Sequence, residues 1–588
     1  MDSVRLLEPV TLSRRRPYFL VLWLLAAVVS GPVGAEPPPI ISGAARFYPV
    51  YAPNGMVATQ ERHATEAALE VLEEGGNAVD AAVTAAFTLA VTLPRAGALG
   101  GGGFMVVHLA EEERTFAIDY RETAPAAAHR DMFLREDGTA DPTKSRFSAL
   151  AVGVPGNVAG LLHALENYGT IDRRRALAPA IALAEEGFPV SKDLFDSLVI
   201  AAPRLFRDPA AREVFYTRFG APRVIGETLR QPDLANTLRR IAEDGAAGYY
   251  TGPVAEKTVD FLRGRGGIMT LEDLAEYRPV ERSTVSGHYR EFTVHSMPPP
   301  SSGGIHLLQL LKMLEPESIA DMGFGSARKI HFMAEAMKRA YADRSVHLGD
   351  TDFVDVPMSE LLDGGYLARR MADFSPHGAT PAADISPGDP LHPAEGDNTT
   401  HFSIVDAHGN AVANTYSINF SYGAQMMVPG TGVLLNNTMD DFSAKPGTPN
   451  AYGLIGGEKN AVEGGKRMLS SMTPTIVLDE GGDVLLVTGS PGGSRIITTT
   501  LQIIVNTIDH GMNIAEATNA PRFHHQWLPE YLRVENGFSP DTLGILRRLG
   551  HEVREMDAMG STQSILREGS WWTGASDPRR PDARTLGH

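Results

Sequence analysis

Residues 397–419 read D-N-T-T-H-F-S-I-V-D-A-H-G-N-A-V-A-N-T-Y-S-I-N, and this stretch decides the fold that the 588-residue sequence predicts. Two runs of strand-forming residues flank a short polar turn, Asp406–Asn410, so the stretch predicts a β-hairpin. A turn centred on His408 implies antiparallel pairing. In that register the opposed residues are Val405 and Ala411, His401 and Thr415, and Thr399 and Ser417.

The register brings two hydroxyl side chains together at the open end of the hairpin. Thr399 and Ser417 face one another with their Cβ atoms roughly 5 Å apart, and Asn419 lies on the same face. Such a pair suits a nucleophile with a partner hydroxyl. Thr and Ser also pair as ordinary contacts within sheets, so the hairpin alone leaves both interpretations open.

A polar segment precedes the hairpin. Residues 375–397 are rich in Pro, Gly and Asp and show no hydrophobic periodicity, which predicts an exposed linker that ends just before Thr399. Self-cleavage at such a junction would leave Thr399 as a new N-terminus.

The length and composition are those of a large globular protein. A chain of 588 residues exceeds what one core normally supports, so several domains or one large layered unit are expected. The formal charge of −18 argues against a nucleic-acid surface, which needs clustered Lys and Arg. The absence of cysteine excludes disulfides and thiolate metal sites.

The first 35 residues resemble an export signal. A basic cluster, Arg14–Arg16, precedes an apolar run, Tyr18–Ser30, and small residues follow up to Ala35, where cleavage is expected. The apolar run is too short to span a bilayer comfortably, which disfavours a membrane anchor. Ser13-Arg14-Arg15 also fits a twin-arginine signal, so the export route stays open.

The region before the linker has mainly helical patterns. Between about Val154 and His347 few segments have strand character. Strands are expected over Met56–Ala58, Phe104–Leu109 and Thr115–Tyr120. Helices are expected over Glu61–Glu74, Asn77–Thr92, Ala159–Tyr168, Ala176–Gly187, Asp233–Asp244, Ala255–Gly264, Gly304–Leu314 and Ile330–Arg344, the last two with the apolar spacing of amphipathic helices.

Two patterns in this region suggest ligand sites that their context does not support. Gly100–Gly103 follows a helix and precedes a strand, the reverse of a dinucleotide-binding loop, so close backbone packing is expected. His331 and Glu335 have i, i+4 spacing, but no H-E-x-x-H motif or third ligand accompanies them. A solvated helix face is therefore expected there rather than a metal site.

The C-terminal part predicts a second hairpin and an anion-binding turn. Thr475–Leu478 and Val484–Thr488 have strand patterns, and Gly489–Ser494 then leads into a helix over Arg495–His510. Unpaired amides at a helix start bind anions, and this turn lacks the Lys of a P-loop. These features fit an oxyanion hole for acyl transfer, in which each amide donor stabilises a tetrahedral intermediate by about 2.7–4 kcal/mol. A plain tight turn is the alternative interpretation.

Nine motifs in order give the chain its resemblance to a known family, and they extend over nearly all of the sequence after residue 35. They are G-G-N-A-V-D-A-A (75–82), L-G-G-G-G-F-M (99–105), D-Y-R-E-T-A-P (119–125), P-P-P-S-S-G-G-I-H (298–306), T-T-H-F-S (399–403), L-L-N-N-x-M-D-D-F-S (434–443), S-S-M-x-P-T (470–475), T-G-S-P-G-G-S-R (488–495) and A-P-R-F-H-H-Q-W (520–527). With these motifs the chain resembles the exported bacterial γ-glutamyltransferases, also called γ-glutamyltranspeptidases or glutathione hydrolases.

The resemblance implies an α+β fold, the αββα sandwich of N-terminal nucleophile hydrolases, made as a precursor that cleaves itself. The cut would fall between Asn398 and Thr399 and give a large chain, 36–398, and a small catalytic chain, 399–588, which stay together. Thr399 would use its freed α-amine as base, because such an amine has a pKa of about 7.7–8.0. The enzyme would pass the γ-glutamyl group of glutathione to water or to amino acid and dipeptide acceptors.

The resemblance also implies a role for each site residue. Thr399 is the nucleophile, with Ser417 in place of a Thr that orients it, and the oxyanion hole is Gly492 and Gly493. The expected substrate-binding residues are Arg121, Ser470 and Ser471 for the α-carboxylate, Asn419, Thr438 and Asp441 for the α-amine, and Tyr452 in a lid loop over 446–456.

One position leaves open which acyl group the enzyme transfers. Thr438 stands where the family usually has Gln or Glu, and losing that acceptor would weaken γ-glutamyl binding or admit acyl groups without an amine. A glutaryl or cephalosporin acylase of the same family is therefore an alternative, and an unprocessed periplasmic binding protein is a third. No metal, cofactor, nucleic acid or stable membrane anchor is expected, and the expected location is the periplasm or the medium.

Overall fold

The computed structural model describes residues 45–386 and 399–588. The chain divides into two units, Met1–Arg46 and Phe47–His588, and the account below concerns the second. The predicted signal peptide (1–35) and Asn398 lie outside the described residues, as does the linker from residue 387 onward. In the described part, no helix is long and apolar enough to cross a membrane.

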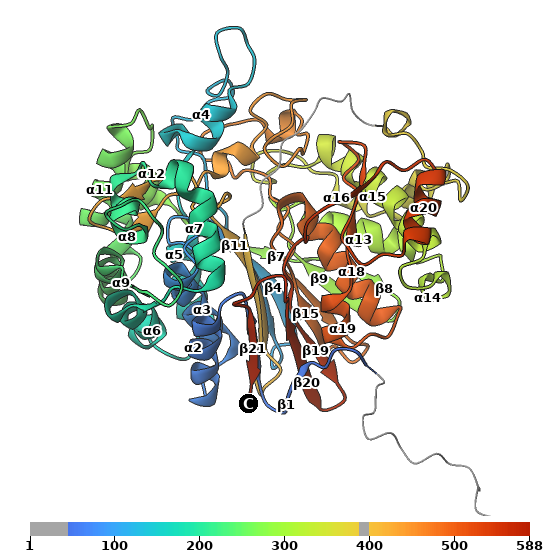
Figure 1. The fold of residues 1–588 in the computed structure, drawn as a ribbon, viewed down its shortest axis with the longest axis horizontal. Coiled ribbons are helices and arrows are strands. Elements are labelled where there is room, and N and C mark those ends of the chain that lie inside the picture. Colours follow the sequence, from blue (N-terminus) through green and yellow to red (C-terminus); the bar gives the residue numbers. More distant parts are fainter. Residues whose placement is uncertain (1–44, 387–398) are drawn as a thin grey trace, which may run out of the picture. The chain divides into compact units, whose positions relative to one another are not determined.

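Two seven-stranded antiparallel sheets lie at the centre of this unit (Figure 1). The first contains the hairpin of residues 400–417, flanked by strands from the N-terminal part of the chain. In spatial order its strands are β21 (Arg584–Gly587), β2 (Met56–Thr59), β10 (Thr400–Val405), β11 (Ala411–Ser417), β3 (Gly102–Leu109), β4 (Arg114–Tyr120) and β7 (Val280–Ser283).

The second sheet contains the other predicted hairpin, β14 with β15. In spatial order its strands are β1 (Val50–Ala52), β20 (Trp571–Ser576), β19 (Gln563–Glu568), β15 (Val484–Thr488), β14 (Thr475–Leu478), β9 (Phe292–Ser296) and β8 (Val285–Tyr289). Small sheets are formed by β5 (Phe188–Pro189) with β6 (Thr228–Leu229), by β12 (Met427–Val428) with β13 (Val433–Leu434), and by β16 (Phe523–His524), β17 (Leu532–Val534) and β18 (Val553–Glu555).

The central hairpin has the register that its sequence predicts. Val405 pairs with Ala411 and His401 pairs with Thr415. The turn is held by the carboxylate of Asp406, which accepts hydrogen bonds from the backbone N–H groups of His408 at 2.8 Å and Asn410 at 3.0 Å. A side chain that bonds its own turn in this way stabilises a tight loop, and it sets Thr399 just before the first strand.

Helices cover the outer face of each sheet, so the layers run helix, sheet, sheet, helix (Figure 1). Those on the first sheet are α2 (Arg62–Glu73), α3 (Ala78–Thr92), α5 (Asn157–Tyr168), α6 (Arg173–Glu186), α7 (Lys192–Leu205), α8 (Pro209–Phe215), α9 (Pro232–Asp244), α10 (Ala247–Tyr250), α11 (Gly252–Arg263) and α12 (Leu271–Glu276). Those on the second are α13 (Gly303–Leu314), α14 (Ile319–Met322), α15 (Ala327–His347), α17 (Gly364–Arg370), α18 (Ile496–Ile508), α19 (Ile514–Asn519) and α20 (Pro540–Arg548). Two short helices lie elsewhere, α4 (Pro142–Phe147) and α16 (Met358–Leu361).

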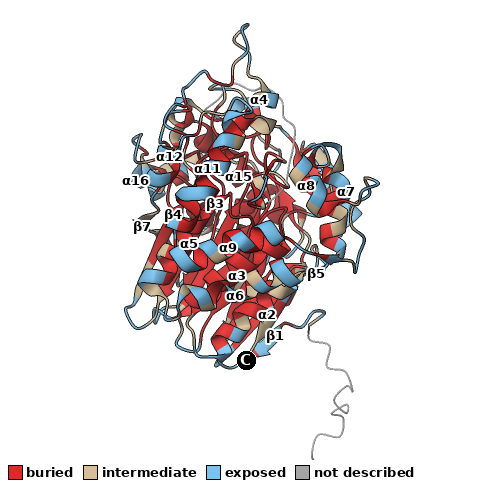
Figure 2. Ribbon diagram, turned by 90° about the vertical axis from the view of Figure 1, so that its left-hand side faces the viewer, coloured by how far each residue is buried: buried red, intermediate tan, exposed pale blue. Residues whose placement is uncertain are grey.

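Buried apolar side chains fill all three interfaces between the layers, and Figure 2 shows the buried residues along the strands and the inner helix faces. Side chains such as Phe104 and Val106 from the first sheet meet Ile476 and Val487 from the second. Burying two sheet faces against each other and two against helices is how a layered domain removes its apolar surface from water. The architecture is therefore the predicted αββα sandwich.

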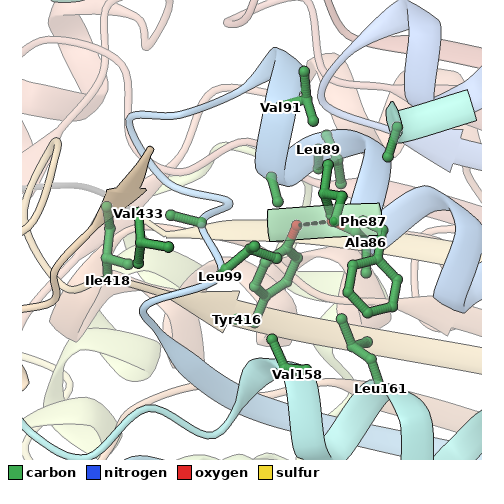
Figure 3. Close-up of a cluster of buried hydrophobic side chains, with 14 of the residues drawn as sticks. Ala86, Phe87, Leu89, Val91, Leu99, Val158, Leu161, Tyr416, Ile418 and Val433 are labelled. Atoms are coloured by element: carbon green, nitrogen blue, oxygen red, sulfur yellow. Dashed lines mark hydrogen bonds between the residues drawn. The ribbon is translucent and has the colours of Figure 1, made fainter. Parts of the chain in front are cut away.

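The hairpin is tied to the innermost helix of its layer. Asn77 caps α3 with a capping box, in which its side chain accepts from the backbone of Asp80 and the Asp80 side chain accepts in return. Tyr416, on β11, packs among the apolar residues of this layer and donates a hydrogen bond from its hydroxyl to the Ala86 carbonyl at 2.9 Å (Figure 3). The strand that carries Ser417 is thereby held against α3.

Two sequence-based expectations fail in this part of the molecule, and a third is confirmed. The region 154–347 is mainly helical, as predicted, although β7, β8 and β9 lie in it and belong to the two central sheets. Helices α13 and α15 are buried nearly all round instead of amphipathic. The described part of the predicted exposed linker, 375–386, is packed on the body: Ala382 is buried and its carbonyl accepts from the Trp527 indole at 2.9 Å.

Candidate active site

Thr399 and Ser417 meet at the open end of the hairpin, as the register predicts. The Thr399 hydroxyl lies 3.5 Å from Oγ of Ser417, and Thr399 is only 5% exposed. The Ser417 hydroxyl also accepts a hydrogen bond from the backbone N–H of Asn419 at 2.8 Å. A buried hydroxyl with a second hydroxyl in reach is a suitable nucleophile once a base is present.

A cavity of about 30 Å³ opens beside the Thr399 hydroxyl. Nine of the residues expected at the site from the sequence line it, and all but Ser417, on β11, lie in the segments between or next to the strands. They are Arg121, Thr399, Ser417, Asn419, Asp441, Tyr452, Ser470, Ser471 and Gly493. Six lining residues were not expected: Arg344, Asn450, Leu454, Leu469, Met472 and Ile496. Gly492 and Thr438 do not line the cavity.

The predicted anion-binding turn is present between β15 and α18. Gly492 and Gly493 have φ angles of 134° and 56°, both in the region that disfavours side chains. Among the described residues, neither amide N–H has a hydrogen-bond partner. Two free amides at the start of a helix, next to a hydroxyl nucleophile, can receive the oxyanion of a tetrahedral intermediate.

Asn419 and Tyr452 close one side of the cavity. Asn419 has a φ of 72°, so its side chain turns back toward the loop that follows β13. Its amide Nδ2 donates to the Asn437 carbonyl at 3.0 Å, and its Oδ1 accepts from the Tyr452 hydroxyl. The Tyr452 ring covers Gly493 so closely that a Cβ on that glycine would lie 2.5 Å from the ring.

Arg121 carries charge into the cavity together with two carboxylates. Its guanidinium donates to Asp441 and, at 3.4 Å, to Glu122. Burial alone would lower the pKa of Arg121, but the carboxylates of Glu122 and Asp441 raise it. Burial also raises the pKa of Glu122 to about 7, and it raises the pKa of Asp441 against the opposing effect of Arg121. The cluster therefore offers both a cation and an anion to a substrate.

Thr438 does not line the cavity beside this cluster. Its hydroxyl donates to the Asn436 side-chain oxygen at 2.7 Å. Asn436 in turn donates to the Gly100 carbonyl at 2.8 Å, inside the glycine run that the sequence predicts to pack closely. A Cβ on Gly100 would lie 2.1 Å from the Leu434 carbonyl oxygen, which confirms that packing. Thr438 thus belongs to the support of the site and not to its wall.

The two serines on the opposite wall are held by the Pro-rich motif. Ser302 donates both its backbone N–H, at 2.9 Å, and its hydroxyl, at 2.8 Å, to the carbonyl of Ser470. Arg344, from the last turns of α15, donates to the Ser302 hydroxyl at 3.0 Å and to the Ser471 hydroxyl at 3.3 Å. Burial lowers the pKa of Arg344 to about 10, so it is still cationic at neutral pH.

The loop that carries Tyr452 is anchored by Asp440. Its carboxylate accepts from the Ala451 backbone N–H at 3.2 Å, from the Ser145 hydroxyl at 2.6 Å and from Nε of Arg146 at 3.2 Å. Burial raises the pKa of Asp440 to about 6. The carboxylate thus joins α4 to the predicted lid loop over the cavity.

The histidine and glutamate considered for a metal site are buried, so the expected solvated helix face is wrong. His331, Glu335 and His551 bring possible ligand atoms within 4.8 Å of one another. The Glu335 carboxylate, however, binds Lys338 and Arg339, each at 2.8 Å, and the two histidine rings bond each other at 2.7 Å. Two cations on the only carboxylate disfavour a bound metal ion, and the cluster instead ties α15 to the loop before β18.

Comparisons with known proteins show which family the chain is similar to. The model of the γ-glutamyltranspeptidase family matches residues 64–586. The chain is 50% identical over 583 residues to a glutathione hydrolase proenzyme of Escherichia coli (strain K12), covering 97% of this chain and 100% of that protein. It is 38% identical over 481 residues to an acylase ACY 1 proenzyme of Pseudomonas sp. (strain SE83), covering 81% and 83%.

Solved structures give the same result. The crystal structure of a cephalosporin acylase from Bacillus halodurans superposes with a TM-score of 0.81 at 27% identity, covering 95% of this chain and 99% of that one. A γ-glutamyltranspeptidase from Helicobacter pylori has a TM-score of 0.55 at 41% identity, covering 59% and 97%. The sandwich is that of the N-terminal nucleophile hydrolases, and the protein is an enzyme of the transferase and hydrolase classes. The chain belongs to the γ-glutamyltranspeptidase family.

Proposed function

We propose that this protein is a self-processing γ-glutamyltransferase and glutathione hydrolase with Thr399 as its nucleophile. One observation carries the proposal: the cavity beside the Thr399 hydroxyl also contains an amide of the glycine turn, an arginine and a carboxylate. These groups match the needs of a γ-glutamyl donor, which has a reactive carbonyl, an α-carboxylate and an α-amine.

Processing would start from the intact precursor. The Thr399 hydroxyl attacks the Asn398 carbonyl, the peptide bond opens to an ester, and water hydrolyses that ester. The products are an Asn398 carboxylate and a Thr399 with a free hydroxyl and a free α-amine. Two chains result, 36–398 after removal of the signal and 399–588, and they remain together because β10 and β11 pair with strands of the large chain on both sides.

Catalysis then follows from the new N-terminus. The α-amine takes the proton of the Thr399 hydroxyl, whose oxygen attacks the γ-carbonyl of the donor, and the developing oxyanion is received by the amides of Gly492 and Gly493. The amine returns the proton to the leaving nitrogen, so that cysteinylglycine departs from glutathione. Water, an amino acid or a dipeptide then attacks the ester carbonyl and restores the hydroxyl.

The walls of the cavity select the acyl group. Arg121, Ser470 and Ser471 hold the α-carboxylate, since a guanidinium and hydroxyls are all donors. Asp441 and the side-chain oxygen of Asn419 accept from the α-amine. The ring of Tyr452 lies over the oxyanion turn and excludes water.

A glutaryl or cephalosporin acylase is the second candidate. Thr438 bonds Asn436 instead of facing the cavity, so one expected acceptor for the α-amine is missing. Relatives named as acylases fit this chain in both sequence and structure. Asp441 favours the γ-glutamyl donor, because its carboxylate at the cavity wall attracts the ammonium group that a glutaryl donor lacks.

The surroundings of the enzyme follow from its first residues. With residues 1–35 acting as an export signal, the mature enzyme works in the periplasm or the medium on small γ-glutamyl compounds. Its partner is its own second chain.

The direct test is turnover by purified protein. We expect hydrolysis of γ-glutamyl-p-nitroanilide and glutathione, loss of both activities in Thr399→Ala, and a raised KM with little change in kcat in Arg121→Ala. Good turnover of glutaryl-p-nitroanilide with none of the γ-glutamyl compound would replace the proposal with the acylase. No turnover of either compound by fully processed protein would reject both.

A further inference from the structure

A second arginine shares the cavity with Arg121, and neither the composition nor the motifs point to it. Arg344 lies in the last turns of α15, is 5% exposed, and lines the same cavity as the Thr399 hydroxyl. Its position in the sequence, within A-Y-A-D-R-S, resembles an ordinary solvent-facing helix residue.

The two arginines differ in how their charges are balanced. Arg121 donates to the carboxylates of Asp441 and Glu122, and its Nε reaches the Met468 carbonyl at 3.4 Å. All three of its nitrogens are therefore occupied, and two of its partners are carboxylates. The charge of Arg121 is therefore largely balanced within the protein before a ligand binds.

Arg344 has only neutral partners among the described residues. Its Nε donates to the Ser302 hydroxyl and one terminal nitrogen donates to the Ser471 hydroxyl, at 3.0 and 3.3 Å. No ion pair joins it to a carboxylate in the described ranges, and Asp441 acts on it only through longer-range attraction. A guanidinium has five N–H donors, and burying one without an anion costs free energy that a bound anion would offset.

We infer that Arg344 is a substrate-binding residue that receives the carboxylate of the acyl donor, alongside the hydroxyl of Ser471. The inference deepens the proposed function and rests on it. Arg121 and Arg344 then hold this carboxylate from two sides of the cavity, and Arg344 supplies the positive charge that no carboxylate of the described residues pairs with. A planar fork opposite a carboxylate allows two parallel hydrogen bonds, which Lys does not reproduce.

The hydroxyls around Arg344 explain how it is aimed. Ser302 accepts from Nε of Arg344 and donates to the Ser470 carbonyl, so the guanidinium is fixed on the Pro-rich motif from behind. One terminal nitrogen donates to Ser471, and both residues line the cavity. The role applies to any donor with a carboxylate at the far end of its acyl chain, whether γ-glutamyl or glutaryl.

Four p-nitroanilides separate this role from a structural one. The γ-glutamyl compound has both carboxylate and amine, the glutaryl compound only the carboxylate, the 4-aminobutyryl compound only the amine, and the butyryl compound neither. Each is measured with wild type, Arg344→Gln and Arg344→Lys. Arg328→Gln is the matched control, because Arg328 is exposed on the same helix. Completeness of self-cleavage on a denaturing gel reports folding.

We expect Arg344→Gln to raise KM for the two carboxylate compounds by about 10-fold to 150-fold, the range for a lost hydrogen bond to a charged group. KM for the two compounds without a carboxylate stays unchanged, Arg344→Lys recovers part of the loss, and Arg328→Gln behaves as wild type. Where a compound is turned over too slowly, its inhibition constant for hydrolysis of the γ-glutamyl compound is measured in place of KM.

Two results would overturn the inference. Equal loss with all four compounds assigns Arg344 a purely structural role, and no change with any of them removes it from binding. Failure of wild type to hydrolyse any of the four would instead reject the proposed function itself. If Arg344→Gln does not process, the same comparison is made with Arg344→Lys, whose KM must still rise selectively for the carboxylate compounds.

Discussion

Two contacts of the Ser417 hydroxyl differ in strength, and their difference allows a quantitative prediction. Its distance to the Thr399 hydroxyl, 3.5 Å, is at the long limit of a hydrogen bond, whereas the Asn419 amide lies at 2.8 Å. Removing the hydroxyl therefore mainly leaves a buried N–H unsatisfied, at a cost of about 1–3 kcal/mol in the free energy of unfolding. The lost contact to the nucleophile is worth about 0.5–1.5 kcal/mol, or a roughly 2-fold to 12-fold slower self-cleavage.

A pair of variants of equal shape isolates the hydroxyl. Ser417→Thr keeps it and adds a methyl group, while Ser417→Val has the shape of Thr without the hydroxyl. We expect the Thr variant to process and unfold much like wild type, and the Val variant to lose thermal stability and to process more slowly by the factors above. Self-cleavage is followed on denaturing gels and unfolding by circular dichroism. Equal behaviour of the Val and Thr variants would refute the role assigned to the hydroxyl.

Two further perturbations test the loops above the cavity. Gly493→Ala places a side chain at a φ of 56°, which costs roughly 1–2 kcal/mol, and 2.5 Å from the Tyr452 ring. We expect kcat/KM for γ-glutamyl-p-nitroanilide to fall at least about 10-fold. Adding Tyr452→Ala should restore part of the activity, and a fully active Gly493→Ala variant would contradict the prediction. Burial raises the pKa of Asp440 to about 6, so between about pH 4 and pH 6 the folded state holds a proton that the unfolded chain has lost, and stability falls as the pH rises. Relative to Asp440→Asn, the free energy of unfolding of wild type should rise by up to about 3 kcal/mol from pH 7 to pH 4, as measured by chemical denaturation. Parallel pH profiles of the two proteins would exclude the effect.

The two hairpins follow from local sequence because their determinants are local. In 400–417 a short polar turn and strand-forming residues on both sides fix the register, and Asp406 bonds its own turn. The same holds for β14 and β15, whose bounds agree with the pattern. A register set by a tight turn needs no information from the rest of the chain.

Helix α15 and the strands before it depend on distant partners, which local patterns do not reveal. The charged residues of α15 suggest a solvated face, yet Glu335 is neutralised within the protein by Lys338 and Arg339. β8 and β9 are short and pair with each other, and β9 also pairs with β14, nearly two hundred residues later in the chain. When residues are buried by partners that lie far away in the sequence, the local sequence shows no hydrophobic periodicity that would predict the burial.

The residues of the candidate site also divide into those that the sequence predicts and those that it does not. The resemblance to a family places nine residues that do line one cavity. It also places Thr438 there, but the hydroxyl of Thr438 is short enough to bond Asn436 instead. Arg344 escapes sequence reasoning because a single Arg in a helix has no distinguishing pattern, and only the structure shows that Ser302 and Ser471 are its partners.

The central claim is that Thr399 becomes an N-terminal nucleophile, and the most direct measurement is N-terminal sequencing of the smaller fragment of purified protein together with its intact mass. The account predicts a sequence that begins T-T-H-F-S and a fragment spanning 399–588, with no cleavage in Thr399→Ala. A single uncleaved chain, a different first residue, or unchanged cleavage in Thr399→Ala would contradict it.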